Sequence, residues 1–345
     1  MKKQIMLLSL SILLFDANIS KSQTNEDKTL VVVGGQESAL AYNQGIKDFN
    51  GLKFSESIED YNKAINGNSQ FYKAYYNRGV ANLQIGKNQE ALNDFNQAIS
   101  LKSDNSIYYI ARAVSEARLG KYSESLKDIN QAQQLGYAES NICYYKGMVL
   151  LMSGRYNEAV KEYNKSVEKN NQYAYAYCDR GNCQYKLGNY KAAIDDYNTA
   201  IQISPSSAFI YVFRAEAKVE MKNLKGALED INKAVELAPD DIDVLSARGR
   251  LFAKNKKLDK AQADFETCIL KDENNPAGYI SMGNLYMQKK DYKKALEYFD
   301  NAIKKAPNSS TAYYNRANAY ELMFEPKKAD ADRKKAQMLE KPNYK

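Results

Sequence analysis

The chain has 345 residues, and its 49 Lys or Arg against 42 Asp or Glu give a formal net charge of +7. It contains no His and no Trp, which excludes general bases, metal ligands and catalytic triads that depend on imidazole. Residues 276–345 carry 14 Lys or Arg against 8 Asp or Glu, so most of the positive charge is local. The lysines follow exposed helix faces rather than one basic stripe, and we therefore do not expect nucleic acid as a partner.

The first 22 residues have the pattern of a signal peptide. Residues 1–3 (Met-Lys-Lys) are basic, and the apolar run at residues 5–15 is too short to span a bilayer as a helix. Residues 20–22 (Ser-Lys-Ser) supply the spaced small residues that a signal peptidase prefers. We predict cleavage between Ser22 and Gln23, a periplasmic or secreted protein, and no transmembrane segment in the mature chain; an uncleaved anchor is the alternative.

Residues 23–37 are polar apart from residues 30–33 (Leu-Val-Val-Val), which precede Gly34 and Gly35. A strand followed by a glycine loop would suggest dinucleotide binding, but no third spaced glycine follows. We interpret this segment as a linker that lies against the first helices of the chain.

One pattern then returns every 34 residues. A small anchor residue is followed after twelve positions by a second small residue and seven positions later by a third, with a large apolar residue between these two. Each copy holds two helical segments, such as 174–187 and 190–203, joined at Gly188 and Asn189, a helix stop followed by a helix start. Neither helix can bury its apolar side alone, so stability must come from the neighbouring copy. The anchors are Gly45, Gly79, Ala113, Gly147, Gly181, Ala215, Gly249, Gly283 and Ala317.

Small and large residues at these spacings resemble the tetratricopeptide repeat. The resemblance extends from Ser38 to about Asn343 and implies an all-α fold: an α-solenoid of nine helix-turn-helix repeats in a right-handed superhelix. In the last repeat Arg333 replaces the large apolar residue, which favours a polar terminal cap. The predicted repeats are 38–71, 72–105, 106–139, 140–173, 174–207, 208–241, 242–275, 276–309 and 310–343.

A basic residue stands one position before most anchors, and an acidic residue stands fifteen positions after them. The two columns change together, because Lys146 coincides with Glu162 and Met282 coincides with Tyr298. We therefore predict structural ion pairs between the two helices of each repeat, rather than a row of catalytic sites, and expect each exposed pair to contribute about 0–1 kcal/mol. The main predicted pairs are Arg78 with Asp94, Arg112 with Asp128, Arg180 with Asp196, Arg214 with Asp230, and Arg248 with Asp264.

The resemblance also implies a concave groove, lined by the first helices, that binds peptides or partner proteins. We call the residues three before each anchor the first column and those one after it the second column. In the first four repeats both columns are apolar, and an apolar stripe facing water is a candidate interaction site. The predicted partner-binding residues are Tyr42, Ile46, Tyr76, Val80, Ile110, Val114, Tyr144 and Met148.

Two alternatives stay open for this stripe: the linker or a second copy of the chain covers it. Relatives that hold a terminal carboxylate place Lys in the first column, and this chain has none there. We therefore do not expect it to bind chaperone tails.

Four Cys in an exported chain raise the question of disulfides. Their spacing argues against pairing, and there is no Cys-x-x-Cys motif for zinc, so we expect free, mostly buried thiols and neither a metal nor a cofactor. The sequence favours a non-catalytic scaffold that binds a partner protein or peptide in the cell envelope or secretory route. The alternatives are an envelope enzyme that uses carboxylates alone and a self-associating structural protein.

Overall fold

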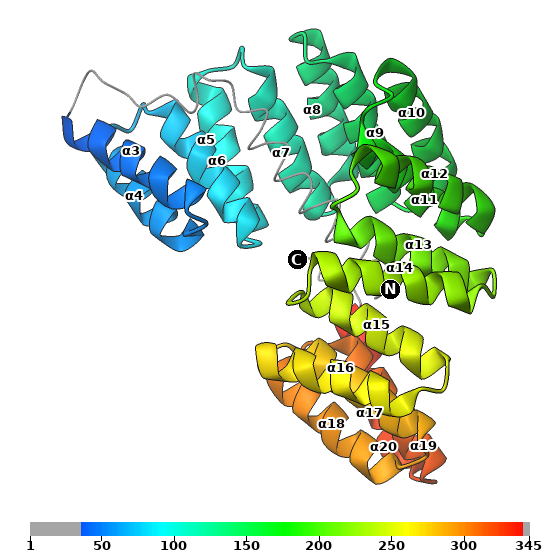
Figure 1. Ribbon diagram of the computed structural model, residues 1–345. Coiled ribbons are helices and arrows are strands. Elements are labelled where there is room, and N and C mark those ends of the chain that lie inside the picture. The colour runs from blue at the N-terminus through cyan, green and yellow to red at the C-terminus, as the bar shows by residue number, and fades with distance from the viewer. Residues whose placement is uncertain (1–35, 341–345) are drawn as a thin grey trace. The chain divides into compact units, whose positions relative to one another are not determined.

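A computed structural model describes residues 36–340, and this part of the chain is entirely helical, with no strand (Figure 1). The predicted signal peptide, its cleavage site and all of the predicted linker except residues 36 and 37 lie outside the described residues. The helices belong to two compact units, residues 36–203 (unit 1) and 204–340 (unit 2).

The helices alternate between a first and a second helix of each repeat. Unit 1 holds α3 (Gln36–Asn50), α4 (Phe54–Gly67), α5 (Tyr72–Gln84), α6 (Asn88–Leu101), α7 (Ser106–Arg118), α8 (Tyr122–Gln134), α9 (Glu139–Met152), α10 (Tyr156–Lys169), α11 (Ala174–Lys186) and α12 (Tyr190–Ile203). Unit 2 holds α13 (Ala208–Glu220), α14 (Leu224–Leu237), α15 (Ile242–Lys254), α16 (Leu258–Lys271), α17 (Pro276–Gln288), α18 (Tyr292–Lys305), α19 (Ser310–Leu322) and α20 (Pro326–Glu340).

Each first helix ends in a tight turn with one residue in the left-handed region. In the second repeat Gly86 has φ 75°, and the N–H of Lys87 donates to the carbonyl of Asn82 at 2.9 Å, which satisfies one of the free carbonyls at the helix end. Glycine fills this position in four repeats of unit 1, whereas unit 2 has Lys222, Lys256 and Lys290 there, with φ between 56° and 62°.

The small anchor of each repeat makes room for one large side chain of the second helix. A Cβ added at Gly181 would lie 2.7 Å from Cε1 of Tyr197, closer than van der Waals contact allows. The anchor is glycine wherever that side chain is aromatic, and alanine where it is Ile129 or Ile231. A glycine anchor therefore leaves room for the aromatic ring of the second helix.

Neighbouring repeats within a unit are joined in two ways. The first helices pack on one another, and the second helix of one repeat packs on the first helix of the next, as α4 does on α5 and α14 on α15. In unit 1 these contacts bury one core that runs from Tyr76 to Cys183. The all-α, helix-pair solenoid predicted from the sequence is confirmed by this arrangement. Across residues 36–340, every helix falls short of the length and apolarity needed to cross a membrane.

Candidate functional site

The structure contains all five named ion pairs. In each, the Arg on the first helix meets the Asp on the second helix with two nitrogens, as Arg180 does with Nε and Nη2 on the two carboxylate oxygens of Asp196. The closest nitrogen–oxygen distances are 2.6 Å for Arg78–Asp94, 2.6 Å for Arg112–Asp128, 2.5 Å for Arg180–Asp196, 2.6 Å for Arg214–Asp230 and 2.6 Å for Arg248–Asp264.

These pairs are less exposed than ion pairs on a helix surface. The Asp196 side chain is 10% exposed and that of Arg180 is 20% exposed. Burial raises the pKa of Asp94 and Asp196, although the adjacent guanidinium acts in the opposite direction. Loss of one Arg would therefore leave a carboxylate without a counter-charge in the packed interior, which costs more than breaking a pair on the surface.

The same arginines also connect one repeat to the one before it. Nη1 of Arg78 donates to Oδ1 of Asn62 at 2.5 Å, and Nη1 of Arg180 donates to Oδ1 of Asn164 at 2.8 Å. We call this Arg–Asp–Asn arrangement the clamp. Asn recurs at this position every 34 residues, from Asn62 to Asn232, and we call these residues the Asn column. The clamp gives a role to Asn62, Asn96 and Asn164 of this column. The clamp also joins Arg112 to Asn96, and Arg316 to Asp300 in place of Asn.

In most clamps, the guanidinium also packs against a tyrosine that stands three residues before the arginine. The guanidinium carbon of Arg180 lies 5.2 Å from the ring centroid of Tyr177, and that of Arg78 lies 5.5 Å from the ring of Tyr75. A guanidinium over an aromatic face gains from the negative face of the ring. The arginine is thus held by an ion pair, an amide and a ring.

The prediction of a pair in every repeat was wrong for the fourth. Nζ of Lys146 donates to Oε1 of Gln133 at 3.0 Å, and Glu162 pairs instead with Lys165 on its own helix at 2.6 Å. A single ammonium lacks the fork with which arginine binds a carboxylate through two nitrogens. In the eighth repeat, Tyr298 stacks on Tyr286 with ring centroids 5.4 Å apart.

The predicted exposure of the first column was also wrong. Tyr42, Tyr76 and Tyr144 are 0% exposed and Ile110 is 1% exposed. Each of these tyrosines lies against the large side chain of its own second helix, as Tyr144 does against Tyr163 with ring centroids 5.9 Å apart. These side chains hold consecutive repeats together and are not free to contact a partner.

Contacts across the repeat boundary explain this burial. Nδ2 of Asn77 donates to the hydroxyl of Tyr42 at 2.9 Å, and the hydroxyl of Tyr144 donates to Oδ2 of Asp179 at 3.1 Å. Asp179 is only 2% exposed, and this burial raises its pKa to about 7. Tyr42 and Tyr144 are therefore part of a polar seam between the first helices of unit 1, and Tyr76 stacks on the ring of Tyr108 in the next repeat, with centroids 4.7 Å apart.

In unit 1 the second column is also buried from the second repeat to the fifth. Val80, Val114 and Met148 are 1%, 2% and 1% exposed and belong to the core, and Ile46 is half-buried. The fifth repeat has Asn182 there, at 0% exposure, which accepts a hydrogen bond from the hydroxyl of Tyr197 at 2.8 Å. The expected water-facing stripe is absent from the described part of this unit.

The second column opens in unit 2. Arg250, Asn284 and Asn318 are exposed and Glu216 is half-buried. Arg250 lies beside Glu216 at 3.7 Å, and one turn further along the same helices Lys254 lies beside Glu220 at 3.4 Å. The accessible part of the first-helix face is therefore polar and lies on α13, α15, α17 and α19.

A carboxylate-only enzyme would need two acids that converge in a pocket. Burial, together with the charge of Asp128, raises the pKa of Glu116 to about 7, but Asp128 is already held by Arg112 and Glu116 is packed between α7 and α8. Among the described residues no cluster of Cys, Asp and Glu has the geometry to hold a metal ion. Nothing in this geometry favours the enzyme alternative.

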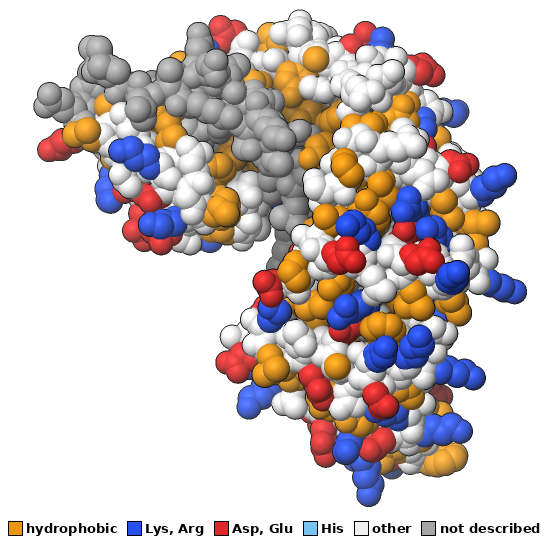
Figure 2. All heavy atoms as spheres, viewed as in Figure 1, with side chains coloured by type: hydrophobic (Ala, Val, Ile, Leu, Met, Phe, Trp, Pro, Cys, Tyr) orange, Lys and Arg blue, Asp and Glu red, His pale blue; other side chains and the backbone are white. Residues whose placement is uncertain are grey.

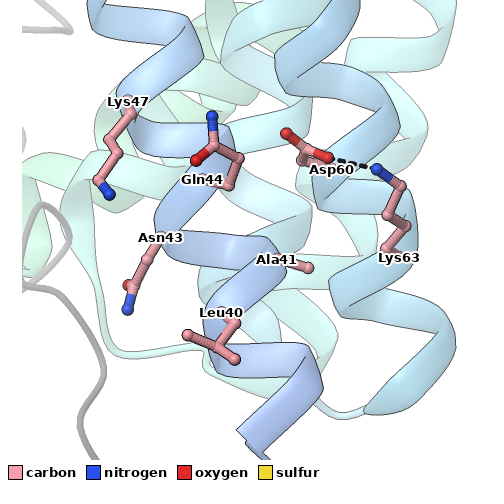
Figure 3. A pocket seen from close by; sticks show the side chains of 7 residues that line it. All are labelled: Leu40, Ala41, Asn43, Gln44, Lys47, Asp60 and Lys63. Atoms are coloured by element: carbon pink, nitrogen blue, oxygen red, sulfur yellow. Dashed lines mark hydrogen bonds and ion pairs between the residues drawn. The ribbon is translucent and has the colours of Figure 1, made fainter.

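One pocket of about 470 Å³ lies on the first repeat, between side chains of α3 and α4 (Figure 3). It contains a single carboxylate, Asp60, which pairs with Lys63 at 2.6 Å, while Leu40 at its rim is 67% exposed. Within each unit, the later first helices pack against the second helix of the preceding repeat, as α5 does on α4 and α15 on α14. Among the described residues, the pocket is lined by α3 and α4 of the first repeat alone. Its lining residues are Leu40, Ala41, Asn43, Gln44, Lys47, Asp60 and Lys63.

All four Cys are free and buried. Burial raises the pKa of Cys143 above its usual value, and it raises that of Cys268 to about 11. Thiols with raised pKa values are poor nucleophiles at neutral pH, so they serve as packing residues here.

Family comparisons agree with the repeat pattern. A tetratricopeptide repeat model matches residues 72–105, 174–207 and 276–309, a TPR repeat model matches 147–188, and a further tetratricopeptide repeat model matches 210–241. The chain belongs to the tetratricopeptide repeat (TPR) family. The first three segments coincide with the second, fifth and eighth predicted repeats. No curated protein matches the sequence significantly.

Three solved structures resemble the fold. The APC/C hetero-tetramer Cut9–Hcn1 has a TM-score of 0.57 at 15% identity, covering 89% of this chain and 74% of that one. A tetratricopeptide repeat protein from Parabacteroides merdae has a TM-score of 0.51 at 18% identity, covering 83% and 99%. Yeast Tom70 has a TM-score of 0.50 at 17% identity, covering 88% and 76%. At these identities the likeness concerns the fold alone.

Proposed function

We propose that this TPR protein is a non-catalytic scaffold that binds a partner protein or peptide through the first-helix face of unit 2. The TPR fold is typically that of an interaction scaffold, which supports the general assignment. The observation that carries the finer proposal is the exposure of Arg250, Asn284 and Asn318, where the same column of unit 1 is buried.

The exposed column suits a polar, extended segment of a partner. Asn284 and Asn318 stand one repeat apart, and each carboxamide both donates and accepts hydrogen bonds, as the main chain of an extended peptide requires. Arg250 and Lys254 add positive charge at one end of the face, each beside a glutamate that limits it. A partner segment with a mixed polar sequence therefore fits this face better than an apolar segment, which was the kind of partner expected for unit 1.

We further propose that the protein acts outside the cytoplasm, in the cell envelope or as a secreted protein. The support is the basic start, the apolar run at residues 5–15 and the small residues at 20–22. A mass spectrum of the native protein that begins at Gln23 would support export, and one that begins at Met1 would contradict it.

Photo-crosslinking in the native cells tests the binding face. Probes at Asn284 and Asn318 should trap one dominant partner, and matched probes at Val80 and Met148, the same column in unit 1, should trap none. Equal capture from both units, or capture only from unit 1, would contradict the proposal. Crosslinks solely to a second copy of the chain would instead support self-association, which light scattering can check.

A further inference from the structure

The turns between the first and second helices of unit 2 carry a concentration of lysines. We call the four turns at residues 221–226, 255–260, 289–294 and 323–328 the basic edge. Because the first helices of neighbouring repeats pack on one another, these turns follow each other along one side of the unit. Figure 2 shows Lys and Arg side chains projecting along the border of unit 2. The lysines of the edge are Lys222, Lys225, Lys256, Lys257, Lys260, Lys289, Lys290, Lys293, Lys294, Lys327 and Lys328.

Few acids oppose this charge, and those present are engaged. Asp259 lies 3.9 Å from Lys289, Asp291 accepts a hydrogen bond from the N–H of Lys294, and Glu325 pairs with Lys328. Seven other lysines of the edge are exposed and form no ion pair within the described residues: Lys222, Lys225, Lys256, Lys257, Lys290, Lys293 and Lys327. The edge thus has a large surplus of positive charge that faces water.

The corresponding turns of unit 1 serve as an internal reference. Their cations, Lys53, Lys87, Lys121, Arg155 and Lys191, are nearly balanced by Glu56, Glu90, Glu124 and Glu158. Turns of the same type therefore form in unit 1 without an excess of positive charge. The basic edge is a property of unit 2 and not of the repeat.

Backbone conformation gives an independent indication. Lys222, Lys256 and Lys290 have φ of 61°, 56° and 62°, a region that glycine occupies without strain and a lysine does not. Four turns of unit 1 use glycine at this position, and the turn of the first repeat has Leu52 with φ 62°. Strained residues are associated with functional surfaces, and here the strain places a cation at the tip of three successive turns.

Exposed apolar side chains accompany the lysines. Phe324, which has φ 61°, is 92% exposed, and Met221 in the first of the four turns is 49% exposed. A polyanion such as duplex DNA offers no apolar phase for such side chains. The boundary between lipid headgroups and acyl chains does, and lysines beside it are attracted to anionic lipids.

From this geometry we propose that the basic edge of unit 2 docks on an anionic lipid surface, with the lysines near headgroup phosphates and Phe324 inserted beneath them. The edge lies at the helix ends, so docking leaves the first-helix face described above free for a partner. This surface is independent of partner binding.

Vesicle binding by the full chain tests the proposal. The edge variant combines Lys222→Gly, Lys256→Gly and Lys290→Gly, which copies the turns of unit 1 and relieves strain, so its thermal stability should be equal or higher. Its partition onto phosphatidylcholine vesicles containing phosphatidylglycerol should fall about a hundredfold. The control variant combines Lys127→Gln, Lys161→Gln and Lys304→Gln, removes the same charge from other exposed positions, and should bind as the unmodified chain does.

A second variant tests insertion. The sequence has no Trp, so Phe324→Trp supplies a single reporter whose fluorescence should shift to the blue on anionic vesicles and stay unchanged on pure phosphatidylcholine. Equal loss in the edge and control variants, no binding of the unmodified chain to anionic vesicles, or tighter binding to a DNA duplex than to vesicles would overturn the proposal. Residues 1–35 are the same in every variant, so their contribution cancels.

Discussion

Units 1 and 2 use the same repeat but place their accessible groups differently. In both, the first column is largely buried between helices; the second column is buried from Val80 to Asn182 in unit 1 and exposed from Arg250 to Asn318 in unit 2. The turns differ in the same way, with charge balance in unit 1 and excess lysine in unit 2. The repeat period therefore fixes packing, and the positions that packing leaves free carry the differences between the units.

The clamp offers the strongest test of this comparison. Arg180→Ala in unit 1 leaves Asp196 buried without a counter-charge and removes the bond to Asn164, so the free energy of unfolding should fall by about 3 kcal/mol. Arg248→Ala in unit 2 loses Asp264 but no bond to a preceding repeat, and should cost about 1 kcal/mol less. Urea denaturation measures both.

A double-mutant cycle supplies the control. Arg180→Ala and Asp196→Ala should show a clear coupling energy, because each residue is the other's main partner. Additive effects would mean that the clamp contributes nothing beyond separate side-chain contacts.

The anchor column comes next in expected size. Gly181→Ala in unit 1 places a Cβ against the ring of Tyr197 and should destabilise the protein by about 1–3 kcal/mol. Adding Tyr197→Ile copies the Ala215–Ile231 combination of unit 2 and should restore part of the melting temperature. A melting temperature unaffected by Gly181→Ala alone would contradict the packing described here.

Glu116 should give the smallest effect, through pH. The equivalent position of unit 2 is Lys218, which pairs with Asp230 at 2.7 Å, whereas Glu116 faces the acids Asp128 and Glu124. Arg112 and Lys121 only partly offset this repulsion. Burial and these charges raise the pKa of Glu116 to about 7, so the folded state holds its proton more tightly than the unfolded state does.

The tighter binding of this proton stabilises the folded state. That contribution is complete below about pH 4.5, the usual glutamate pKa, and is lost as pH rises through about 7. Glu116→Gln should remove the contribution of Glu116 to this pH dependence, while that of Asp179, whose pKa is also raised to about 7, remains. The variant should raise stability at pH 8 by about 1 kcal/mol, after allowing for solvent screening. Melting curves at pH 5.5 and pH 8 measure the change. A variant that keeps the dependence of the unmodified chain would assign it to another group.

Most of the fold could be predicted from the sequence, because the 34-residue pattern recurs nine times and each copy indicates the same pair of helices. Glycine and cap residues predicted the helix ends, as at Gly188. Two columns that change together predicted the ion pairs. The bond between Asn164 and Arg180 could not be predicted, because the two residues stand in neighbouring repeats and only the packing of those repeats brings them together.

The candidate site was harder to predict, because facing a groove and being exposed are different properties. Tyr144 has the spacing of a groove residue, yet the ring of Tyr163 and the carboxylate of Asp179 enclose it. Periodicity gives the direction of a side chain and does not report how closely the next repeat approaches. The excess lysine in the turns of unit 2 was visible in the sequence as local charge, but the gathering of these turns on one edge required the stack.

The central claim is that the second column is accessible in unit 2 and closed in unit 1. Thiol labelling of the full chain tests it directly with Val80→Cys and Met148→Cys against Asn284→Cys and Asn318→Cys, because the four native thiols are buried and react slowly. We predict rapid labelling at the two positions of unit 2 and protection at the two of unit 1 until the protein is denatured. Equal labelling rates in the folded protein would contradict the account.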